Sequence, residues 1–216
     1  MPDIKYFFAP GACSIAPHIL LHEASIQYTP LQSKYAGVEV QFPEEFRKLN
    51  PKMRVPVLVV DDDVITELPA VSTMISILAP RKQFMGKTPL ETVRVYEWMN
   101  YLSGTLHATG FGLFFRPWRW TTDPDSKIHE GIKEKSRDII VESFGYIESR
   151  LKGTYAVGEA LTAVDPFLYA MYRWAKGSGF DLAPYPKYAN LVEALEKRPS
   201  VKVVLQKEGL EPLTAE

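Results

Sequence analysis

Over the first 80 residues, short β-rich segments alternate with helical patterns. Residues 4–8 are apolar and end at a Pro-Gly pair, which predicts a strand followed by a turn. After Ser14, hydrophobic residues from Ile15 to Leu20 recur at helical spacing. The pattern predicts further strands at residues 27–32, 55–60 and 64–66, and helices at residues 42–49 and 67–78. This β-α-β-α-β-β-α order is typical of a small α/β unit in which helices cover a four-stranded sheet.

From residue 90 onward, only helical patterns are present. Hydrophobic residues recur at helical spacing over residues 96–106, 128–151, 162–176, 188–197 and 201–207. Thr162 and Asp165 have the spacing of a capping box, with Asp in place of the usual Glu, and we interpret Asp165 as a structural cap. The sequence thus predicts an α/β domain over residues 1–80, a linker over residues 81–87 and an all-α domain over residues 88–216.

Composition excludes several classes of partner. The chain has 216 residues, with 25 Lys and Arg against 26 Asp and Glu, so its formal net charge is −1. No global field therefore favours nucleic acid or a membrane surface, and we expect neither as a partner. No apolar run is long enough to span a bilayer, and the N-terminus lacks the pattern of a secretory signal. We therefore expect a cytoplasmic protein.

Cysteine and histidine usage narrows the chemistry further. The single cysteine, Cys13, excludes an intrachain disulfide framework and a Cys-rich zinc site. The four histidines are not paired with other donors at metal-ligand spacing, so we expect no metal. We interpret His18 and His22 as residues on a helix face that are satisfied by local hydrogen bonds.

The turn between the first strand and the first helix brings a thiol and a hydroxyl, Cys13 and Ser14, to a helix N-terminus. Unpaired amides and the positive end of the helix dipole stabilise a thiolate there, which predicts a lowered pKa for Cys13. The alternative is that Cys13 is a small buried hydrophobic side chain, as free cysteines commonly are. No second cysteine follows three residues later, so dithiol–disulfide exchange is disfavoured.

Two further turns carry candidate binding groups. Val55-Pro56 stands at the head of a strand, where a cis bond would turn the backbone of Val55 outward as an edge for an extended peptide. An ordinary trans proline is the alternative. At the next helix start, backbone amides can receive a carboxylate and Glu67 can accept from an ammonium group. Alternatively, Glu67 only complements the helix dipole.

Together these features resemble the glutathione transferase superfamily, most closely its bacterial beta-type and similar microbial branches. The resemblance covers essentially the whole chain and rests on residues 7–14, 16–18, 49–52, 55–58, 66–67, 98–103, 107 and 162–165. It implies an N-terminal thioredoxin-like domain that binds glutathione, an all-helical domain with a hydrophobic pocket for a second substrate, and a homodimer.

The resemblance also implies roles for single residues. Cys13 and Ser14 would lie beside the glutathione sulfur, and His107 would line the active-site cleft from the helical domain. The residues expected to hold glutathione are Lys52, Arg54, Val55, Pro56, Glu67 and Leu68. Among them, Val55 would pair with the cysteinyl backbone, and Glu67 with the amide of Leu68 would hold the γ-glutamyl end.

Residues 110–120 are both aromatic and basic. They could form the wall of a pocket for a flat apolar or anionic substrate, with Arg116 or Arg119 pairing a carboxylate or stacking on a ring. Core packing with snorkelled arginines is the alternative. The predicted substrate pocket comprises Phe8, Phe111, Phe115, Arg116, Trp118 and Arg119.

Some positions depart from the family pattern. Phe8 stands where the beta-type pattern often has Tyr, so no phenol can activate the sulfur from that position. Leu68 replaces a common Ser or Gly, and Met53-Arg54 replaces the usual Gly-Gln. Loss of one charged hydrogen bond costs about 1.5–3 kcal/mol, so these changes predict weaker or altered glutathione binding.

Three hypotheses of function follow. The first is a glutathione transferase that activates the glutathione thiol for attack on an electrophilic apolar small molecule, as in detoxification. The second is a glutathione-dependent isomerase, dehydratase or dehalogenase of one specific metabolite. The third, motivated by Phe8 and Leu68, is a non-catalytic binding module with the same fold.

Overall fold

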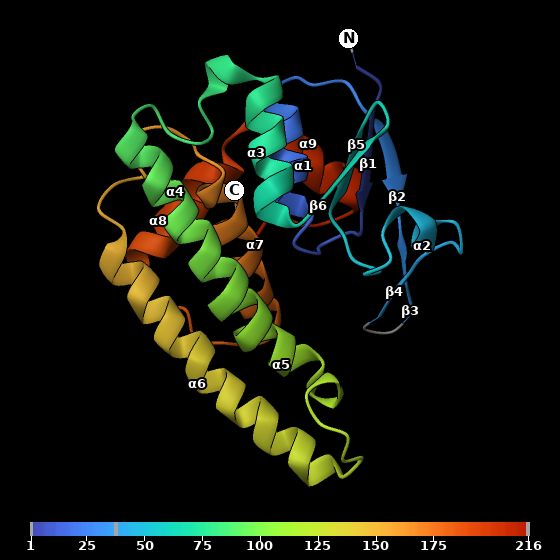
Figure 1. Cartoon of the computed structure of the whole chain (residues 1–216). Helices are drawn as coiled ribbons and strands as arrows, with labels where there is room; N and C mark the ends of the chain where they lie inside the picture. The colour runs from blue at the N-terminus through green and yellow to red at the C-terminus, as the bar shows by residue number, and fades with distance from the viewer. Residues whose placement is uncertain (1, 37–38, 215–216) are drawn as a thin grey trace.

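The computed structural model describes residues 2–36 and 39–214. Figure 1 shows two parts: a sheet with its helices, blue to teal, and a group of helices drawn from green to red. Within the described ranges, no helix is both long and apolar enough to cross a membrane. The α/β part precedes the helical part along the chain, which is the order that the sequence predicts.

The sheet has four strands in the order β2-β1-β5-β6. The first strand, β1, runs parallel to β2 and antiparallel to β5, which pairs antiparallel with β6. A separate hairpin pairs β3 with β4. The strands are β1 (Ile4–Phe8), β2 (Thr29–Gln32), β3 (Lys34–Ala36), β4 (Glu39–Gln41), β5 (Val57–Val60) and β6 (Asp63–Thr66). The helices of this part are α1 (Ile15–Glu23), α2 (Phe46–Leu49) and α3 (Leu68–Leu78).

Alternate residues of the central strands face opposite sides of the sheet. On one side, Tyr6, Phe8 and Leu58 belong to the large core that includes α1, α3 and the helical part. On the other side, Phe7, Val57 and Val59 pack with Phe46 of α2. The two-residue period of a strand produces this division, because successive side chains point to opposite faces. The sheet is therefore covered on both sides.

The second part is entirely helical in the described residues. It is preceded by a short 3-10 turn, η1 (Pro80–Lys82). Its elements are α4 (Pro89–Tyr101), η2 (Leu102–Phe111), α5 (Gly112–Phe115), η3 (Pro117–Arg119), α6 (Ser126–Arg150), α7 (Val164–Gly177), α8 (Pro186–Glu196) and α9 (Pro199–Glu208). Two of these helices, α7 and α9, pack against α1 and so join the two parts.

Helices α4, η2 and α5 follow one another without a break. Thr88 caps the start of α4 by accepting a hydrogen bond from the amide of Glu91 at 3.2 Å. The ten residues of η2 form a π-helix, and the carbonyl of His107 within it accepts from the amide of Gly112. A π-helix is rare and often marks a functional site, because its wider turn redirects side chains. His107 lies in this segment.

Several predicted boundaries differ from the structure. Strand β1 covers the residues predicted, but β2 begins at Thr29 and β5 begins at Val57, after the proline that cannot donate a ladder hydrogen bond. The helix predicted at 42–49 is a single turn, α2. The β3–β4 hairpin was not predicted, because its strands are only three residues each.

Asp165, near the start of α7, has the structural role that its spacing predicts. Its buried carboxylate accepts from the amide of Thr162 at 2.6 Å, from the Thr162 hydroxyl at 3.0 Å and from the amide of Ala156 at 2.8 Å. Thr162 does not return a side-chain bond to the amide of Asp165, whose partner is the Thr162 carbonyl at 3.3 Å. One half of a capping box is therefore formed, and it also fastens the loop before α7.

Candidate functional site

A cavity of about 600 Å³ lies between the sheet and the helical part. It is bounded by the turn before α1, the β3–β4 hairpin, the segment from η2 to η3, and α7. Its aromatic lining consists of Tyr35, Phe42, Phe111, Phe115, Trp120 and Trp174, and its charged lining of Glu39, Arg54, Arg116 and Arg119. The cavity therefore combines flat apolar walls with an excess of cations.

A smaller cavity of about 210 Å³ shares part of this lining. The residues common to both cavities are Cys13, Arg54, Val55, His107 and Ala108. The remainder of the smaller cavity has no aromatic wall of comparable size, and its polar members are Asn50, Thr66, Glu67 and Ser103. Two adjoining spaces of different character thus meet at Cys13, Val55 and His107.

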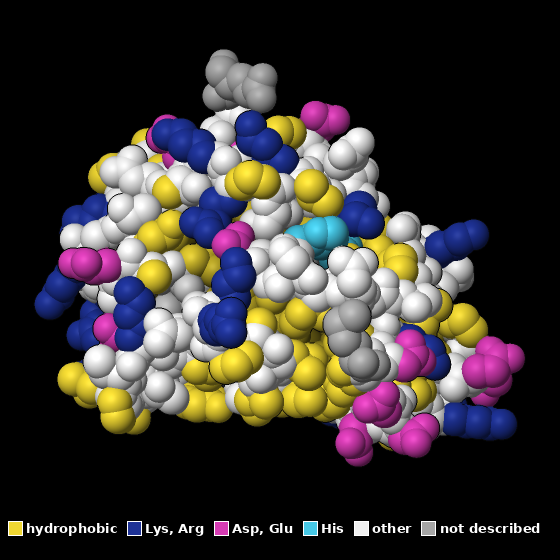
Figure 2. Space-filling model, turned by 90° about the horizontal axis from the view of Figure 1, so that it is seen from above, with side chains coloured by type: hydrophobic (Ala, Val, Ile, Leu, Met, Phe, Trp, Pro, Cys, Tyr) yellow, Lys and Arg dark blue, Asp and Glu magenta, His cyan; other side chains and the backbone are white. Residues whose placement is uncertain are grey.

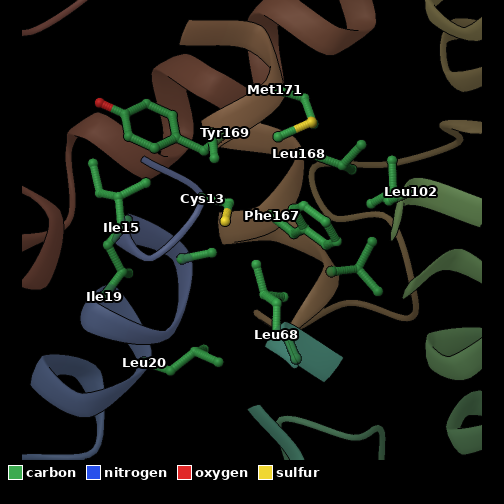
Figure 3. Close-up of a cluster of buried hydrophobic side chains, with 14 of the residues drawn as sticks. Cys13, Ile15, Ile19, Leu20, Leu68, Leu102, Phe167, Leu168, Tyr169 and Met171 are labelled. Carbon is green, nitrogen blue, oxygen red and sulfur yellow. The ribbon is translucent and has the colours of Figure 1, made fainter. Parts of the chain in front are cut away.

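Cys13 lies in the turn before α1, and its thiol donates to the carbonyl of Val55 at 3.7 Å. Figure 3 shows it within an apolar cluster, between Ile15 of α1 and Phe167 of α7. Burial raises the pKa of Cys13 to about 12, although the backbone amides of Cys13 and Ser14 act in the opposite direction. The predicted lowering of this pKa is wrong, because desolvation outweighs the helix N-terminus.

Ser14 is fully buried and lines neither cavity. Its hydroxyl donates to the carbonyl of Ala9 and accepts from the amide of Ala9, both at 3.2 Å. These two bonds close the turn between β1 and α1. The expectation that Ser14 faces the reacting sulfur is therefore corrected: its hydroxyl holds the turn.

The turn is also held from the helical part, at Gly11. The Gly11 amide donates to Glu208 Oε2 at 2.8 Å, and the Gly11 carbonyl accepts from Trp174 Nε1 at 2.8 Å. The other carboxylate oxygen of Glu208 lies 2.7 Å from His18 Nδ1, and both side chains are fully buried. His18 Nε2 bonds to the hydroxyl of Tyr28 at 2.6 Å.

These contacts correct the reading of His18 and add a residue that sequence reasoning missed. The partner of His18 on Nδ1 is 190 residues away, so its hydrogen bonding is not local. His22 does have a local partner, since its Nε2 lies 2.9 Å from the Tyr28 hydroxyl. Glu208 carried no signal in the sequence beyond being an acidic residue at the end of an amphipathic helix.

The Val55-Pro56 bond is cis, so the alternative of an ordinary trans proline is wrong. Both residues line the smaller cavity, together with Glu67 and Leu68 at the start of α3. Glu67 adopts a φ of 71°, in the region that L-residues rarely occupy, and such a conformation costs about 1–3 kcal/mol. Strain of this size at a cavity wall is typical of functional sites.

Lys52 does not line either cavity but contacts one wall. Its ammonium group donates to Glu67 Oε1 at 2.5 Å and to the Thr66 hydroxyl at 2.7 Å. It therefore fixes the Glu67 carboxylate at the rim of the smaller cavity. Arg54 lines both cavities, and Met53 before it has a φ of 52°, which explains why glycine suits that position in the family pattern.

His107 lies at the junction of the two cavities, with its ring 5.2 Å from that of Trp174 and 6.0 Å from that of Phe167. Burial, with the positive charges of Arg116 and Arg54, lowers the pKa of His107 to about 4. The imidazole is therefore neutral at physiological pH and can accept a proton or a hydrogen bond.

Arg116 and Arg119 both lie in the larger cavity wall and bind one carboxylate, that of Glu39 on β4. Two other residues of the predicted pocket lie elsewhere. Phe8 is buried in the core, 4.6 Å from the ring of His18, because β1 directs it toward α1. Trp118 is 43% exposed and lines neither cavity. Trp120, two residues later, lines the larger cavity where Trp118 was expected.

The junction of the cavities can stabilise an anion. It offers a neutral imidazole, the guanidinium group of Arg54 and a buried thiol that is a hydrogen-bond donor at neutral pH, and the charge of Arg116 in the larger cavity acts on the same imidazole. Within the described ranges, no group of three or more His, Cys, Asp or Glu side chains could hold a metal ion. The arrangement suits a reaction in which a nucleophile bound in the smaller cavity attacks a substrate in the larger, aromatic one.

Comparison with known proteins assigns the α/β part and the helical part of the chain to one family. The family model described as the glutathione S-transferase N-terminal domain matches residues 12–76, and that of the C-terminal domain matches residues 117–208. The glutathione S-transferase GstA of Escherichia coli O157:H7 is 29% identical over 96% of this chain and 100% of its own. A maleylacetoacetate isomerase of Mus musculus is 25% identical over 89% of this chain and 87% of its own.

Solved structures agree with the sequence relatives. A glutathione transferase homologue from Sulfitobacter, with bound glutathione, has a TM-score of 0.88 and 29% identity, covering 98% of this chain and 100% of its own. A beta class glutathione S-transferase of Sphingomonas chungbukensis has a TM-score of 0.79 and 26% identity, covering 96% of this chain and 100% of its own. The mixed sheet of the first part is thus the thioredoxin-like domain of these proteins, followed by their helical domain.

Proposed function

Since this chain belongs to the glutathione S-transferase superfamily, an enzyme family with glutathione as co-substrate, we propose that it activates the glutathione thiol for attack on an electrophilic, apolar small molecule. One observation carries the proposal: a polar and an aromatic cavity meet at Cys13, Val55 and His107. Conjugation of foreign electrophiles would make the physiological role one of detoxification.

The smaller cavity has the chemistry that glutathione requires. Glutathione is an extended tripeptide with one ammonium group and two carboxylates. Glu67 supplies a carboxylate for the ammonium group, and Arg54 supplies a cation for a carboxylate. The backbone of Val55 precedes β5 in the wall of the smaller cavity, and an extended peptide in that cavity could pair with it. The proposed roles of these residues follow from this match in charge and shape.

The larger cavity would hold the electrophile. Phe111, Phe115, Trp120 and Trp174 provide flat apolar surfaces for an aromatic or conjugated molecule. Because this cavity shares residues with the smaller one, a thiolate bound at the junction would face the electrophile without crossing solvent. Proximity of this kind contributes several kcal/mol to catalysis.

Activation of the thiol would fall chiefly to His107 and its neighbours. The neutral imidazole can accept a hydrogen bond or the proton from the thiol, although its pKa of about 4 makes it a weak base. The charges of Arg54 and Arg116 favour the thiolate that results. We propose a lesser role for Cys13 than the sequence suggested, since a thiol with a pKa of about 12 is a poor nucleophile at neutral pH. In that setting Cys13 serves as a hydrogen-bond donor beside the reacting sulfur.

Steady-state conjugation of glutathione to 1-chloro-2,4-dinitrobenzene tests this proposal, with His107→Gln and a matched variant, His129→Gln, at a half-buried histidine that lines neither cavity. We expect His107→Gln to lower kcat at least tenfold, because a positioned general base contributes about 10²–10⁴-fold. The affinity for glutathione, measured by calorimetric titration, should change less than threefold. His129→Gln should match the wild type. Equal rates in the two variants would remove His107 from the proposal.

A second candidate is an isomerase that uses glutathione transiently. The relatives named maleylacetoacetate isomerase favour it, as does the cationic wall of the larger cavity. The two candidates differ in their treatment of general electrophiles. An isomerase of this kind would bind glutathione in the titration and leave 1-chloro-2,4-dinitrobenzene unreacted, whereas a transferase would conjugate it.

We also propose that the chain forms a homodimer. Ile77 at the end of α3 and Leu90 and Val93 at the start of α4 are each at least 60% exposed, although they are aliphatic. Figure 2 shows hydrophobic side chains gathered along one margin of the face viewed from above. Light scattering should give a mass twice that of the chain, and Val93→Glu should shift it toward a monomer.

A further inference from the structure

Two arginines of the larger cavity hold one carboxylate between them. Arg116 Nε lies 3.3 Å from Glu39 Oε1, and Arg119 Nη2 contacts Glu39 Oε2, so each oxygen has its own guanidinium partner. Arg116 follows the end of α5 and Arg119 ends η3, both in the helical part. Glu39 is the first residue of β4, in the α/β part. All three side chains line the cavity.

The charge of this wall is not balanced by Glu39. The lining of the larger cavity contains the guanidinium groups of Arg54, Arg116 and Arg119, and Glu39 is its one acidic member within the described ranges. The imidazole of His107 is neutral, because its pKa is about 4. The wall therefore keeps a positive charge while Glu39 is in place, beside the aromatic rings of Phe115 and Trp120.

The contact of Glu39 with the two arginines is also weak enough for another carboxylate to replace that of Glu39. The side chains of Glu39 and Arg119 are 42% and 34% exposed, and ion pairs between exposed side chains are weak, whereas Arg116, at 23%, is the more enclosed partner. By contrast, Arg198 holds Glu23 with two bonds of 2.6 and 3.2 Å, and a hydroxyl of Ser200 adds a third. That pair lies away from both cavities and is structural.

We propose that Arg116 and Arg119 form a carboxylate subsite for the second substrate, and that Glu39 occupies this subsite when no substrate is bound. The inference rests on the proposed function and names its substrate class: an aromatic or conjugated electrophile that carries a carboxylate. Its ring lies against the aromatic wall, and its carboxylate replaces that of Glu39 between the two guanidinium groups. Glu39 is thereby a specificity-determining residue, because it competes with substrate anions.

The decisive experiment measures binding, so that it does not depend on turnover. Two unreactive probes differ only in charge: 3,5-dinitrobenzoate and 3,5-dinitrobenzamide. Their Kd values are obtained by quenching of tryptophan fluorescence in the wild type, Glu39→Gln, Arg119→Gln and the control Arg94→Gln, an exposed arginine on α4. Circular dichroism and thermal unfolding confirm that each variant is folded.

We expect Glu39→Gln to tighten binding of the benzoate about threefold to tenfold relative to the benzamide, because the competing carboxylate is gone. Arg119→Gln should weaken the benzoate at least tenfold relative to the benzamide. Arg94→Gln should leave the ratio of the two Kd values within twofold of the wild type. If neither Glu39→Gln nor Arg119→Gln changes that ratio by more than twofold, the subsite is refuted.

A kinetic measurement separates this inference from the proposed function. The substrates are 4-chloro-3,5-dinitrobenzoate and 4-chloro-3,5-dinitrobenzamide. In both, the glutathione thiolate forms a C–S bond at the chlorinated carbon, and chloride leaves with the electron pair of the broken C–Cl bond. If neither is conjugated, the proposed transferase function fails, while the Kd ratio still decides the subsite. If both are conjugated and the Kd ratio is unchanged in the variants, only the subsite fails.

Discussion

Replacing Glu208 by alanine should strongly destabilise the joint between the two parts of the protein. The Glu208 carboxylate is fully buried, lies 2.7 Å from His18 Nδ1 and accepts from the Gly11 amide at 2.8 Å. Alanine removes the acceptor for both groups and leaves each of them buried. An unsatisfied buried polar group costs about 1–3 kcal/mol, and this substitution leaves two such groups.

We therefore expect Glu208→Ala to lower the free energy of unfolding by about 3–5 kcal/mol. The measurement is urea unfolding followed by circular dichroism. With a slope of about 2–3 kcal/mol per molar urea, the midpoint should fall by about 1–2.5 M. Glu208→Gln keeps one carbonyl acceptor and should lose less, about 1–3 kcal/mol.

Gln206→Ala provides the matched control, since Gln206 is an exposed residue on the same helix, α9. It should change the free energy of unfolding by no more than about 0.5 kcal/mol. A loss below about 1 kcal/mol in Glu208→Ala would refute the reasoning, because it would mean that water or another side chain satisfies His18 and Gly11.

Three further predictions concern the turn before α1 and the junction of the cavities. Ser14→Ala should lower the free energy of unfolding by about 1–3 kcal/mol, because it leaves the buried amide of Ala9 without an acceptor, while the Ala9 carbonyl keeps the amide of Ala12. A rate of conjugation more than fivefold lower in the folded variant would contradict our placement of the hydroxyl. Cys13, with its pKa of about 12, should react with iodoacetamide at least a hundredfold more slowly than free cysteine at pH 7.5. If the reaction rate stops rising with pH below pH 9, the pKa of Cys13 is lower than we infer. His107 binds its proton less readily in the folded protein, with a pKa of about 4, than in the unfolded chain, near 6.5, so the folded state loses stability as the pH falls from 6.5 to 4. This loss should be about 1–3 kcal/mol greater in the wild type than in His107→Gln when urea unfolding is compared at pH 4.5 and 7, and parallel curves would contradict it.

Much of the fold was predictable because its signals are local. The apolar run of β1 and the helical spacing after Ser14 define the first strand and helix from neighbouring residues alone. The same holds for the half-formed capping box at Asp165, whose partner Thr162 is three residues away. The hairpin β3–β4 was missed, since strands of three residues are too short for a periodic signal.

The candidate site was predicted in outline from motifs, and the side chains at its centre were not all placed correctly. Cys13, Val55 and His107 lie at the junction of the cavities, which agrees with the positions that the family pattern indicated. Phe8 and Ser14 point elsewhere, because their orientation depends on which face of β1 and α1 meets the core. The sequence names the residues near the turn without giving the direction of each side chain.

The sequence by itself determined the order of strands and helices apart from the β3–β4 hairpin, and the motifs that identify the family, because each motif depends on residues close together in the chain. Only the tertiary structure decided the protonation of Cys13, the pairing of His18 with Glu208 and the contact of Glu39 with Arg116. These properties depend on burial and on contacts between segments far apart in the sequence, 190 residues in the case of His18 and Glu208. No local pattern contains that information, since desolvation and long-range pairing exist only once the chain has packed.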